Sequence, residues 1–446
     1  TTATSLYAAL DKCNPSYDKT FVIGGEQLYR EAMDSPHCDN LYLTEIHKTS
    51  YDCDAFFPTV PSNFKQVSYK NCNDEMSFLT FAQMYDYESD ERQYQKLLSD
   101  IINNGDLKKG RNGNTYALYG PQHTFDLSRG FPLLTTKKLS FKHIAAELLW
   151  FLRGDTNVRY LIDHGCNIWN EDAYNFYVKR LESQGMYPIT FDDFIDAVKS
   201  GVKLQQLESV HSGIPKDYEL GDCGFQYGKV WRSWQSWVDT PEVHPMAKGS
   251  VWVDQIGRLI QGLKKNPQSR RHIVTAVDPA NDTNLALYWC HSMFQFNCRP
   301  LTSLERSHYA VNNALLHRNE LMFPSEYEDK TLDAQLDEAG VPKYYLDCQM
   351  YQRSADVFLG VPYNIASYAL LTHILAKICN MVPGEYIHTF GDVHIYDNHL
   401  EQVDEQLSRD TKKLPTVKIG KTNEFWKGFD IGMIGHLDPK DFQVEN

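Results

Sequence analysis

Apolar residues recur at helical spacing over several long stretches of the chain. The repeat in residues 91–105 predicts a helix that ends at Gly105. Residues 139–165 predict two further helices around a break at 153–155. Residues 354–384 run from a loop into a long, nearly all-apolar helix. Because a helix that is apolar on every side must be buried, we expect this one at the centre of a domain.

The first part of the chain shows short apolar runs, which are typical of strands. Residues 19–33 predict a strand, a Gly-Gly turn and a helix start, and residues 40–58 predict two more strands. A charged, glycine-free stretch then separates this part from the rest. We therefore expect one domain at residues 1–86 and another at 93–446, joined by a junction at 87–92.

Two segments interrupt the pattern of the second domain. The first, near 174–219, is polar around the amphipathic centre TFDDFIDAVKSGV, and the second, near 299–345, is rich in charge and lacks a clean period. Both are expected to be surface insertions, because long polar connections in compact domains run over the surface.

Length and composition indicate a folded protein with more than one core. The 446 residues are 42% apolar and 23% charged, and no run approaches the roughly 20 apolar residues that span a bilayer. The net charge of -14 disfavours a polynucleotide partner, so an anionic ligand needs a local group of arginines. The cysteines are scattered without Cys-x-x-Cys pairs and no targeting segment opens the chain, which predicts a reducing, cytoplasmic location.

The stretch 287–296, LYWCHSMFQF, places Cys290 beside His291 at the start of an apolar, aromatic strand. The cysteine is either a nucleophile or a small apolar residue, and the dipeptide alone favours the second interpretation. Arginines within 266–274 and 351–358, segments that also contain Ser and Gln, offer the positive charge that lowers the pKa of a thiol. His291 is interpreted as structural, because consecutive side chains on a strand point to opposite faces.

Eight ordered blocks between residues 91 and 435 point to one family. They are GFPLLTTKK (130–138), ELLWFLRGDTN (147–157), IW (168–169), YGKVWRSW (227–234), SRRHIV (269–274), CHSMFQF (290–296), QRSADVFLGVPYNIASYALLTH (352–373) and HTFGDVHIYDNH (388–399). Together they resemble thymidylate synthase. The VIGG turn at 22–25 and the pattern of 40–58 resemble the C-terminal half of dihydrofolate reductase, whose earlier half has no counterpart here.

Joined in this order, the two parts resemble the bifunctional dihydrofolate reductase–thymidylate synthase family. The resemblance implies an α/β (α+β) fold with a large mixed sheet and a long buried central helix, preceded by a partial reductase-like domain. Gly24 and Gly25 correspond to the turn under the NADPH pyrophosphate. Because the first half of the reductase has no counterpart, reductase activity is implied for a complete reductase domain but is not expected of this chain alone.

The resemblance implies reductive methylation of dUMP to dTMP. 5,10-Methylenetetrahydrofolate would supply both the one-carbon unit and the hydride, leaving dihydrofolate, and no metal is implied. An unactivated pyrimidine ring is a poor carbon nucleophile, so the family adds a cysteine thiolate to C6 and makes C5 reactive. Cys290 stands at the position of that cysteine.

The resemblance also assigns roles around the cysteine. Phosphate binding is implied for five residues, the last two from the second subunit of a homodimer: Arg111, Arg353, Ser354, Arg270 and Arg271. Proton transfer and folate chemistry are implied for Glu147, Tyr227 and Asp356. Contacts with the deoxyribose and the base are implied for His394, Tyr396, Asn364 and Gln352. Trp169 and Gly360 are implied to line the folate site.

Several positions depart from the family pattern. Tyr288 and Trp289 replace a pair of prolines, and the tail 436–446 differs from the small apolar tail of the family. Two other functions therefore stay open. One is a dUMP or dCMP hydroxymethylase, which adds water rather than hydride to the methylene, and the other is a catalytically weak homologue with a structural role.

Overall fold

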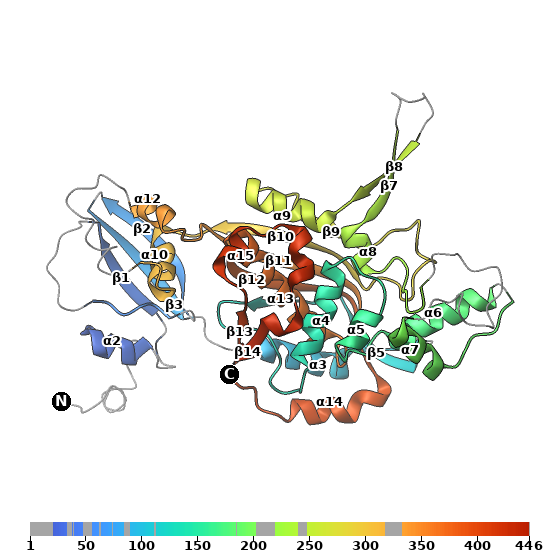
Figure 1. Ribbon diagram of the computed structural model, residues 1–446. Coiled ribbons are helices and arrows are strands. Elements are labelled where there is room, and N and C mark those ends of the chain that lie inside the picture. Colours follow the sequence, from blue (N-terminus) through green and yellow to red (C-terminus); the bar gives the residue numbers. More distant parts are fainter. Residues whose placement is uncertain are drawn as a thin grey trace. The chain divides into compact units, whose positions relative to one another are not determined.

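The computed structural model describes residues 21–33, 38, 40–47, 56–61, 64–73, 75–83, 90–110, 113–183, 185–201, 219–239, 248–316 and 332–445. Contacts between Cα atoms divide the chain into two compact units, which are described separately (Figure 1). The smaller unit comprises residues 1–89 and 301–342, and the larger unit comprises residues 90–300 and 343–446.

The first segment of the smaller unit forms a three-stranded antiparallel sheet and one helix. Its elements are α2 (Glu26–Met33), β1 (Asn40–Ile46), β2 (Phe64–Asn73) and β3 (Met76–Gln83), with the strand order β1-β3-β2. Its small apolar core includes Met33, Leu41, Phe64 and Leu79. Phe64 is buried at the start of β2, and the residues of β2 that follow it are exposed.

Two of the strands expected in this segment are not seen. Residues 21–25 form no strand, because nothing within the described residues pairs with them, and Phe21 and Ile23 are exposed. The strand expected after β1 falls partly on residues 48–55, which lie outside the described residues, and residues 56–58 are not strand. The helix start predicted after the Gly-Gly turn is confirmed as α2.

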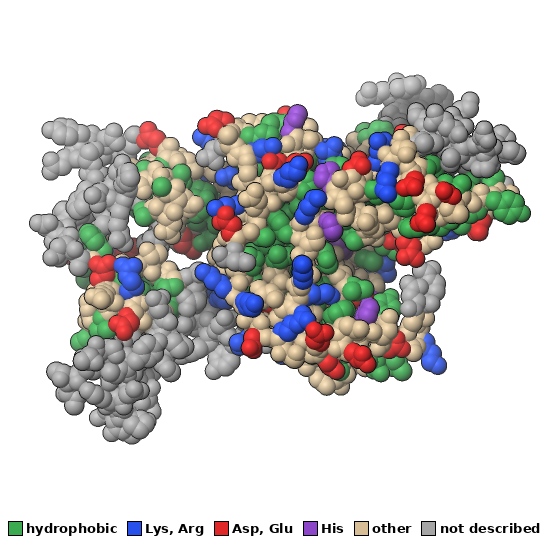
Figure 2. All heavy atoms as spheres, turned by 60° about the horizontal axis from the view of Figure 1, so that its bottom comes forward, with side chains coloured by type: hydrophobic (Ala, Val, Ile, Leu, Met, Phe, Trp, Pro, Cys, Tyr) green, Lys and Arg blue, Asp and Glu red, His purple; other side chains and the backbone are tan. Residues whose placement is uncertain are grey.

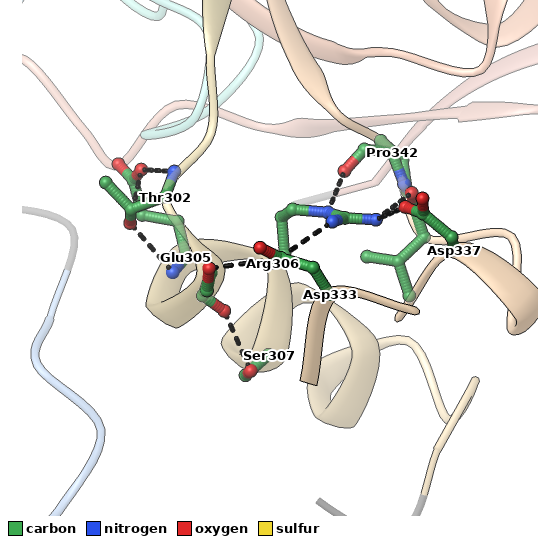
Figure 3. A network of polar contacts seen from close by, with 9 residues as sticks. Thr302, Glu305, Arg306, Ser307, Asp333, Asp337 and Pro342 are labelled. Atoms are coloured by element: carbon green, nitrogen blue, oxygen red, sulfur yellow. Dashed lines mark hydrogen bonds and ion pairs between the residues drawn. The ribbon is translucent and has the colours of Figure 1, made fainter. Parts of the chain in front are cut away.

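The second segment of the smaller unit connects two strands of the larger unit. It contains α10 (Ser303–Asn312) and α12 (Leu332–Glu338), which the sequence did not predict. The buried guanidinium of Arg306 joins the two helices, since it binds the carboxylates of Asp333 and Asp337 and the carbonyl oxygen of Pro342 (Figure 3). The buried guanidinium is thus fully hydrogen-bonded within a short helical pair that has a very small apolar core.

The larger unit is built on a seven-stranded sheet with the order β4-β5-β12-β11-β10-β9, in which β6 also pairs with β12. Its strands are β4 (Asp106–Gly110), β5 (Gly113–Tyr119), β6 (Gln122–Asp126), β9 (Ile273–Thr275), β10 (His291–Pro300), β11 (Tyr344–Asp356) and β12 (Val382–Tyr396). Strands β11 and β12 are parallel and the other pairs are antiparallel. The expected α/β fold with a large mixed sheet is therefore confirmed.

Two smaller sheets complete the strands of this unit. They are the hairpin of β7 (Trp234–Asp239) and β8 (Lys248–Val253), and the pair of β13 (Thr416–Ile419) and β14 (Phe442–Glu445). The helices of the unit are α3 (Asp90–Asn104), α4 (Phe141–Leu152), α5 (Arg159–Asp163), α6 (Asn170–Glu182), α7 (Phe191–Ser200), α8 (Tyr227–Arg232), α9 (Gln255–Lys265), α13 (Val361–Cys379), α14 (Leu400–Leu407) and α15 (Asn423–Lys427).

The helices predicted from apolar spacing are confirmed. Helix α3 ends directly before Gly105, and α4 and α5 lie on either side of the break at 153–155. The long apolar helix is α13, which is buried along most of its length and packs on β11 and β12 (Figure 1). The centre of the main core is therefore formed by the helix that the sequence placed there.

The first expected insertion contributes to the main core. Tyr177 and Leu181 on α6 and Phe194 on α7 are buried in the same apolar cluster as α13. A surface excursion is therefore the wrong description for this part of 174–219, because its apolar spacing is that of two packed helices. Residues 202–218 lie outside the described residues.

Within the described residues no helix is both long and apolar enough to cross a membrane, and no group of His, Cys, Asp and Glu is placed to hold a metal ion. Figure 2 shows several Lys and Arg side chains among apolar ones near the middle of the face drawn. Positive charge is therefore present locally although the chain as a whole carries a net charge of -14.

Candidate active site

Cys290 is the last residue before β10, and its thiol lies close to a guanidinium. The backbone N–H groups of Cys290 and His291 donate to the hydroxyl oxygen of Tyr227, at 2.8 and 3.1 Å. The Sγ atom lies 3.6 Å from Nη2 of Arg353. Burial raises the pKa of the Cys290 thiol, and the Arg353 guanidinium opposes that effect by stabilising the thiolate. Ionisation of this thiol therefore depends on the positive charge beside it.

Arg353 is positioned by the two residues that precede the cysteine. Its Nε donates to the carbonyl oxygen of Trp289 at 3.0 Å, and its Nη2 donates to that of Tyr288 at 3.4 Å. The guanidinium also lies over the ring of Tyr288, 4.9 Å from its centroid. The buried indole of Trp289 donates to the carbonyl oxygen of Phe225 at 3.0 Å. The two residues that replace the prolines of the family thus hold the arginine against the thiol.

Glu147, on α4, is a buried carboxyl group connected to the same region through Trp169. The indole N–H of Trp169 donates to Oε1 of Glu147 at 2.7 Å, and the Trp169 ring lies 6.3 Å from that of Tyr227. Burial raises the pKa of Glu147 to about 7, and the hydrogen bond from Trp169 opposes this shift. A carboxyl group that titrates near neutrality can both accept and donate a proton at physiological pH.

The raised pKa of Glu147 predicts a pH-dependent stability. Between the ordinary value of 4.5 and about 7 the folded chain keeps a proton that the unfolded chain has lost. The free energy of unfolding therefore falls as pH rises through this window, and the loss is complete above it. Glu147→Gln, which has no such proton, should gain stability relative to the natural chain as pH rises from about 5 to about 8.

Thermal melting of both proteins across this pH range measures the difference. Glu401→Gln, at an exposed position on α14, is the matched control for the chemical change. A difference in melting temperature between Glu147→Gln and the natural chain that stays constant with pH would show that Glu147 does not titrate near 7.

Tyr227 opens α8 and links the carboxyl group to the cysteine. Its oxygen accepts the two backbone N–H groups described above, which leaves its own hydrogen available to a ligand. Burial raises the pKa of Tyr227 far above its ordinary value, so the hydroxyl stays protonated. The tyrosine can therefore donate a hydrogen bond at the point where the strand with Cys290 begins.

Asp356 and Gly360 shape the turn from β11 into α13. Oδ1 of Asp356 accepts the N–H groups of Phe358 and Leu359, at 3.0 and 2.9 Å, which leaves Oδ2 for other donors. Gly360 is the N-cap of α13, and a Cβ there would meet the carbonyl oxygen of Asp356 at 3.3 Å and Oδ1 of Asn364 at 3.6 Å. The glycine thus keeps open the space beside the Asp356 carbonyl group and the Asn364 side chain.

Strand β12 carries His394 and Tyr396, whose rings lie 5.4 Å apart. Nδ1 of His394 lies 2.8 Å from Oδ1 of Asp392, and the other oxygen of Asp392 binds Lys108 on β4. Partial burial acts to raise the pKa of Asp392, but the hydrogen bonds from Lys108 and His394 hold it below its ordinary value. Because the carboxylate takes the hydrogen on Nδ1, Nε2 of His394 is the nitrogen left to accept one from a ligand.

His291 fits the structural role that the sequence analysis gave it. Its ring packs between those of Tyr227 and Tyr368, at 5.1 and 5.3 Å. Burial lowers the pKa of His291 to about 4, although a hydrogen bond with Asn364 opposes this effect. The imidazole is therefore neutral at physiological pH and cannot supply the positive charge for the Cys290 thiolate.

Five expected site residues are not joined to this group. Arg111 lies outside the described residues. Arg270 and Arg271 are exposed just before β9, and within the described part of the chain neither guanidinium has an ion-pair partner. Arg271 lines a cavity of about 670 Å³ beside α9. Gly24 and Gly25 belong to the smaller unit.

Three residues of this region were missed by sequence reasoning. Asp392 had a usable signal, because residues two apart on a strand share a face and His394 was already a candidate. Lys108 and His388 had no local signal, because Lys108 meets Asp392 and His388 meets Gln352 only across the sheet. The sequence of one strand does not show which side chain of another strand faces a given charged or aromatic residue.

A thiol held beside a guanidinium at the end of a mixed sheet, with a carboxyl group that titrates near neutrality, is the arrangement of an α/β enzyme that uses a cysteine nucleophile. The family model for thymidylate synthase matches residues 92–446, and the model for dihydrofolate reductase matches residues 1–88. The chain therefore belongs to the thymidylate synthase family. A reductase part precedes the synthase part, as in a bifunctional dihydrofolate reductase–thymidylate synthase.

Curated relatives agree with the larger of these matches. The thymidylate synthase of Staphylococcus haemolyticus (strain JCSC1435) is 41% identical over 345 residues, which cover 76% of this chain and 91% of the relative. That of Listeria monocytogenes serotype 4b (strain CLIP80459) is 38% identical over 350 residues, 77% of this chain and 94% of the relative. That of Listeria innocua serovar 6a is 39% identical over 335 residues, 74% of this chain and 90% of the relative. Both families that match this chain use folate substrates.

Proposed function

We propose that the larger unit converts dUMP to dTMP, with 5,10-methylenetetrahydrofolate as donor of both the one-carbon unit and the hydride. The observation that carries the proposal is the Cys290 thiol 3.6 Å from the Arg353 guanidinium, in a chain of the thymidylate synthase family. A thiolate is the nucleophile that this reaction needs, and the guanidinium is the group that stabilises it.

The reaction starts with a bond between Cys290 Sγ and C6 of the uracil ring. The electron pair of the C5–C6 bond moves toward O4, and C5 of the resulting enolate attacks the methylene carbon of the folate. C5 then loses its proton, and this electron pair expels the tetrahydrofolate amine, which leaves an exocyclic methylene at C5 while sulfur is still bonded to C6. Hydride from the folate adds to that methylene to give the methyl group, so the folate is oxidised to dihydrofolate as the base is reduced. The electron pair that returns to C5 re-forms the C5–C6 double bond and expels the Cys290 thiolate.

Glu147 and Tyr227 handle the protons of these steps. With a pKa of about 7, Glu147 can give a proton, through water, toward the oxygen that gains charge at C4 and take it back later. Tyr227 keeps its hydrogen and donates it beside the C5–C6 edge. Trp169, Asp356 and Gly360 are the residues that we assign to the folate.

The nucleotide is held at its other groups by residues of strands β11 and β12, by Arg111 and by a partner subunit. Arg353, Ser354 and Arg111 bind the phosphate, together with Arg270 and Arg271 of the partner subunit in a homodimer. His394 accepts the hydrogen of the 3′-hydroxyl at Nε2, because Asp392 holds its Nδ1–H, and Tyr396 binds the same hydroxyl. Four guanidiniums near one dianion also stabilise the thiolate.

A cross-subunit site predicts complementation between two inactive variants. Cys290→Ser and the double variant Arg270→Ala, Arg271→Ala each remove one half of every site. After mixing and subunit exchange, heterodimers contain one intact site, so about a quarter of all sites and of the natural activity should return. Turnover measured before and after exchange decides this, and no recovery despite proven exchange would mean that both arginines act within their own subunit.

The reductase part is assigned to NADPH through its glycine turn. Gly24 has a positive φ of 129° and a Cβ at Gly25 would meet nothing within 4 Å, so the backbone before α2 can approach a phosphate. When bound to a complete reductase domain, NADPH supplies hydride to dihydrofolate. A cytoplasmic location is proposed from the free cysteines of the described residues.

Product analysis tests the proposed function. Purified protein with dUMP and 5,10-methylenetetrahydrofolate should form dTMP and dihydrofolate in equal amounts. Formation of 5-hydroxymethyl-dUMP with tetrahydrofolate would identify a hydroxymethylase instead, and absence of any turnover would identify a structural homologue.

A further inference from the structure

Gln352 is a buried amide at the centre of a chain of hydrogen bonds that includes Asn364 and His388. Its side chain lies on β11, and the residue is only 4% exposed. Its Nε2 donates to the carbonyl oxygen of Ser354 and to Oδ1 of Asn364, both at 3.1 Å. Its Oε1 lies 2.9 Å from Nε2 of His388. Both amide hydrogens of Gln352 are thus used within the protein, and neither is left for a nucleotide.

A backbone carbonyl group fixes the donor-to-acceptor direction of these hydrogen bonds. The oxygen of Ser354 can only accept, so the NH₂ group of Gln352 must face it. The second hydrogen of that group then points to Asn364, which must present its oxygen rather than its nitrogen. A reversed Asn364 amide would place its NH₂ against the NH₂ of Gln352, and two buried donors would oppose each other.

His388 secures the other end of Gln352. It lies on β12, is fully buried, and its ring packs 3.9 Å from that of Phe390. Burial lowers the pKa of His388 well below its ordinary value, so the ring is neutral and has one N–H. Because Oε1 of Gln352 is an acceptor, that hydrogen must be on Nε2, and within the described residues Nδ1 has no partner.

We propose that Gln352 and His388 are positioning residues that lock the Asn364 amide in one orientation and thereby select uracil against cytosine. At C4 and N3 uracil presents an acceptor and a donor, whereas cytosine presents a donor and an acceptor. A freely turning amide could match either base, but a locked amide matches only one. This inference rests on the proposed function, because it takes Asn364 as the residue that reads the base.

The first test removes the amide hydrogens of residue 352 with little change in the shape of its side chain. In Gln352→Glu a carboxyl group, even when protonated, has one hydrogen and cannot serve both Ser354 and Asn364. Asn364 then turns its NH₂ toward Glu, and the ratio of kcat/KM for dUMP to that for dCMP should fall about tenfold or more. Tritium release from C5-labelled nucleotides measures both values. Gln261→Glu, at an exposed position on α9, is the matched control and should keep the natural ratio.

The second test uses a pair of variants at His388. His388→Phe keeps a flat ring but removes the N–H, so Gln352 loses one of its two anchors and the ratio should fall. His388→Gln places an amide donor near the same point and should restore most of the ratio. If Gln352→Glu does not fold, as judged by thermal melting, the two His388 variants by themselves test whether the Asn364 amide is locked.

The outcomes distinguish a failure of the proposed lock on Asn364 from a failure of the proposed function. Variants that lose activity with dUMP and dCMP by the same factor, so that the ratio stays unchanged, would show a merely structural role and refute the lock. Absence of folate-dependent tritium release from dUMP by the natural protein would instead refute the proposed function, whatever the variants do.

Discussion

Cys290→Ser is expected to lose turnover by about a thousandfold or more while it still binds dUMP. A serine hydroxyl ionises far less readily than a thiol, and the single guanidinium 3.6 Å away cannot make up that difference. Binding should persist because the phosphate and ribose contacts do not involve the sulfur. Steady-state dTMP formation and equilibrium binding of dUMP, measured on the same preparation, test both halves of this prediction.

The matched control removes a thiol elsewhere. Cys72 is exposed on β2 of the smaller unit, and Cys72→Ser should keep the natural turnover. If Cys290→Ser retained more than about a tenth of the natural rate, covalent attack by this sulfur could not be the route of the reaction.

Asn364→Asp is expected to narrow or reverse the preference for dUMP over dCMP. The amide matches the O4 acceptor and the N3–H donor of uracil, whereas a carboxyl group can accept from the C4 amine of cytosine and, when protonated, donate to N3. Each buried polar group left opposed costs about 1–3 kcal/mol, which corresponds to about one to two powers of ten in relative rate. Tritium release from C5-labelled dUMP and dCMP gives the ratio for each protein.

Asn103→Asp, at an exposed position on α3, is the control for the same chemical change and should leave the ratio unaltered. Equal release from dUMP and dCMP by the natural protein would contradict the role of Asn364. A natural preference for dCMP would favour the hydroxymethylase branch of the family.

Much of the larger unit could be predicted from the sequence because its signals are local. The ends of α3 and the buried position of α13 follow from apolar spacing and from Gly105, which are properties of neighbouring residues. The strand expected before the Gly-Gly turn is not formed at residues 21–23 for a related reason: a strand needs a partner, and an apolar run does not show whether one is present.

The residue types of the candidate site could be predicted from the sequence, but the direction of the hydrogen bonds between them could not. The resemblance placed Gln352 and Asn364 near the base, yet only the folded structure shows that the Ser354 carbonyl fixes the direction of both amides. The insertion expected near 299–345 shows the same limit, because Arg306 meets Asp333 and Asp337 across a long stretch of sequence. Hydrogen-bond direction and long-range pairing are decided by the fold and leave no local pattern.

The most direct test of the account is the covalent complex with 5-fluoro-dUMP and 5,10-methylenetetrahydrofolate. The fluorine at C5 cannot leave as a cation, so the reaction should stop after the folate methylene has joined C5 and while sulfur is still bonded to C6. Digestion and mass spectrometry of this complex should place the nucleotide and the folate on the peptide that contains Cys290. An adduct on another residue, or no adduct under conditions where both ligands bind, would contradict the assignment of Cys290 as the nucleophile.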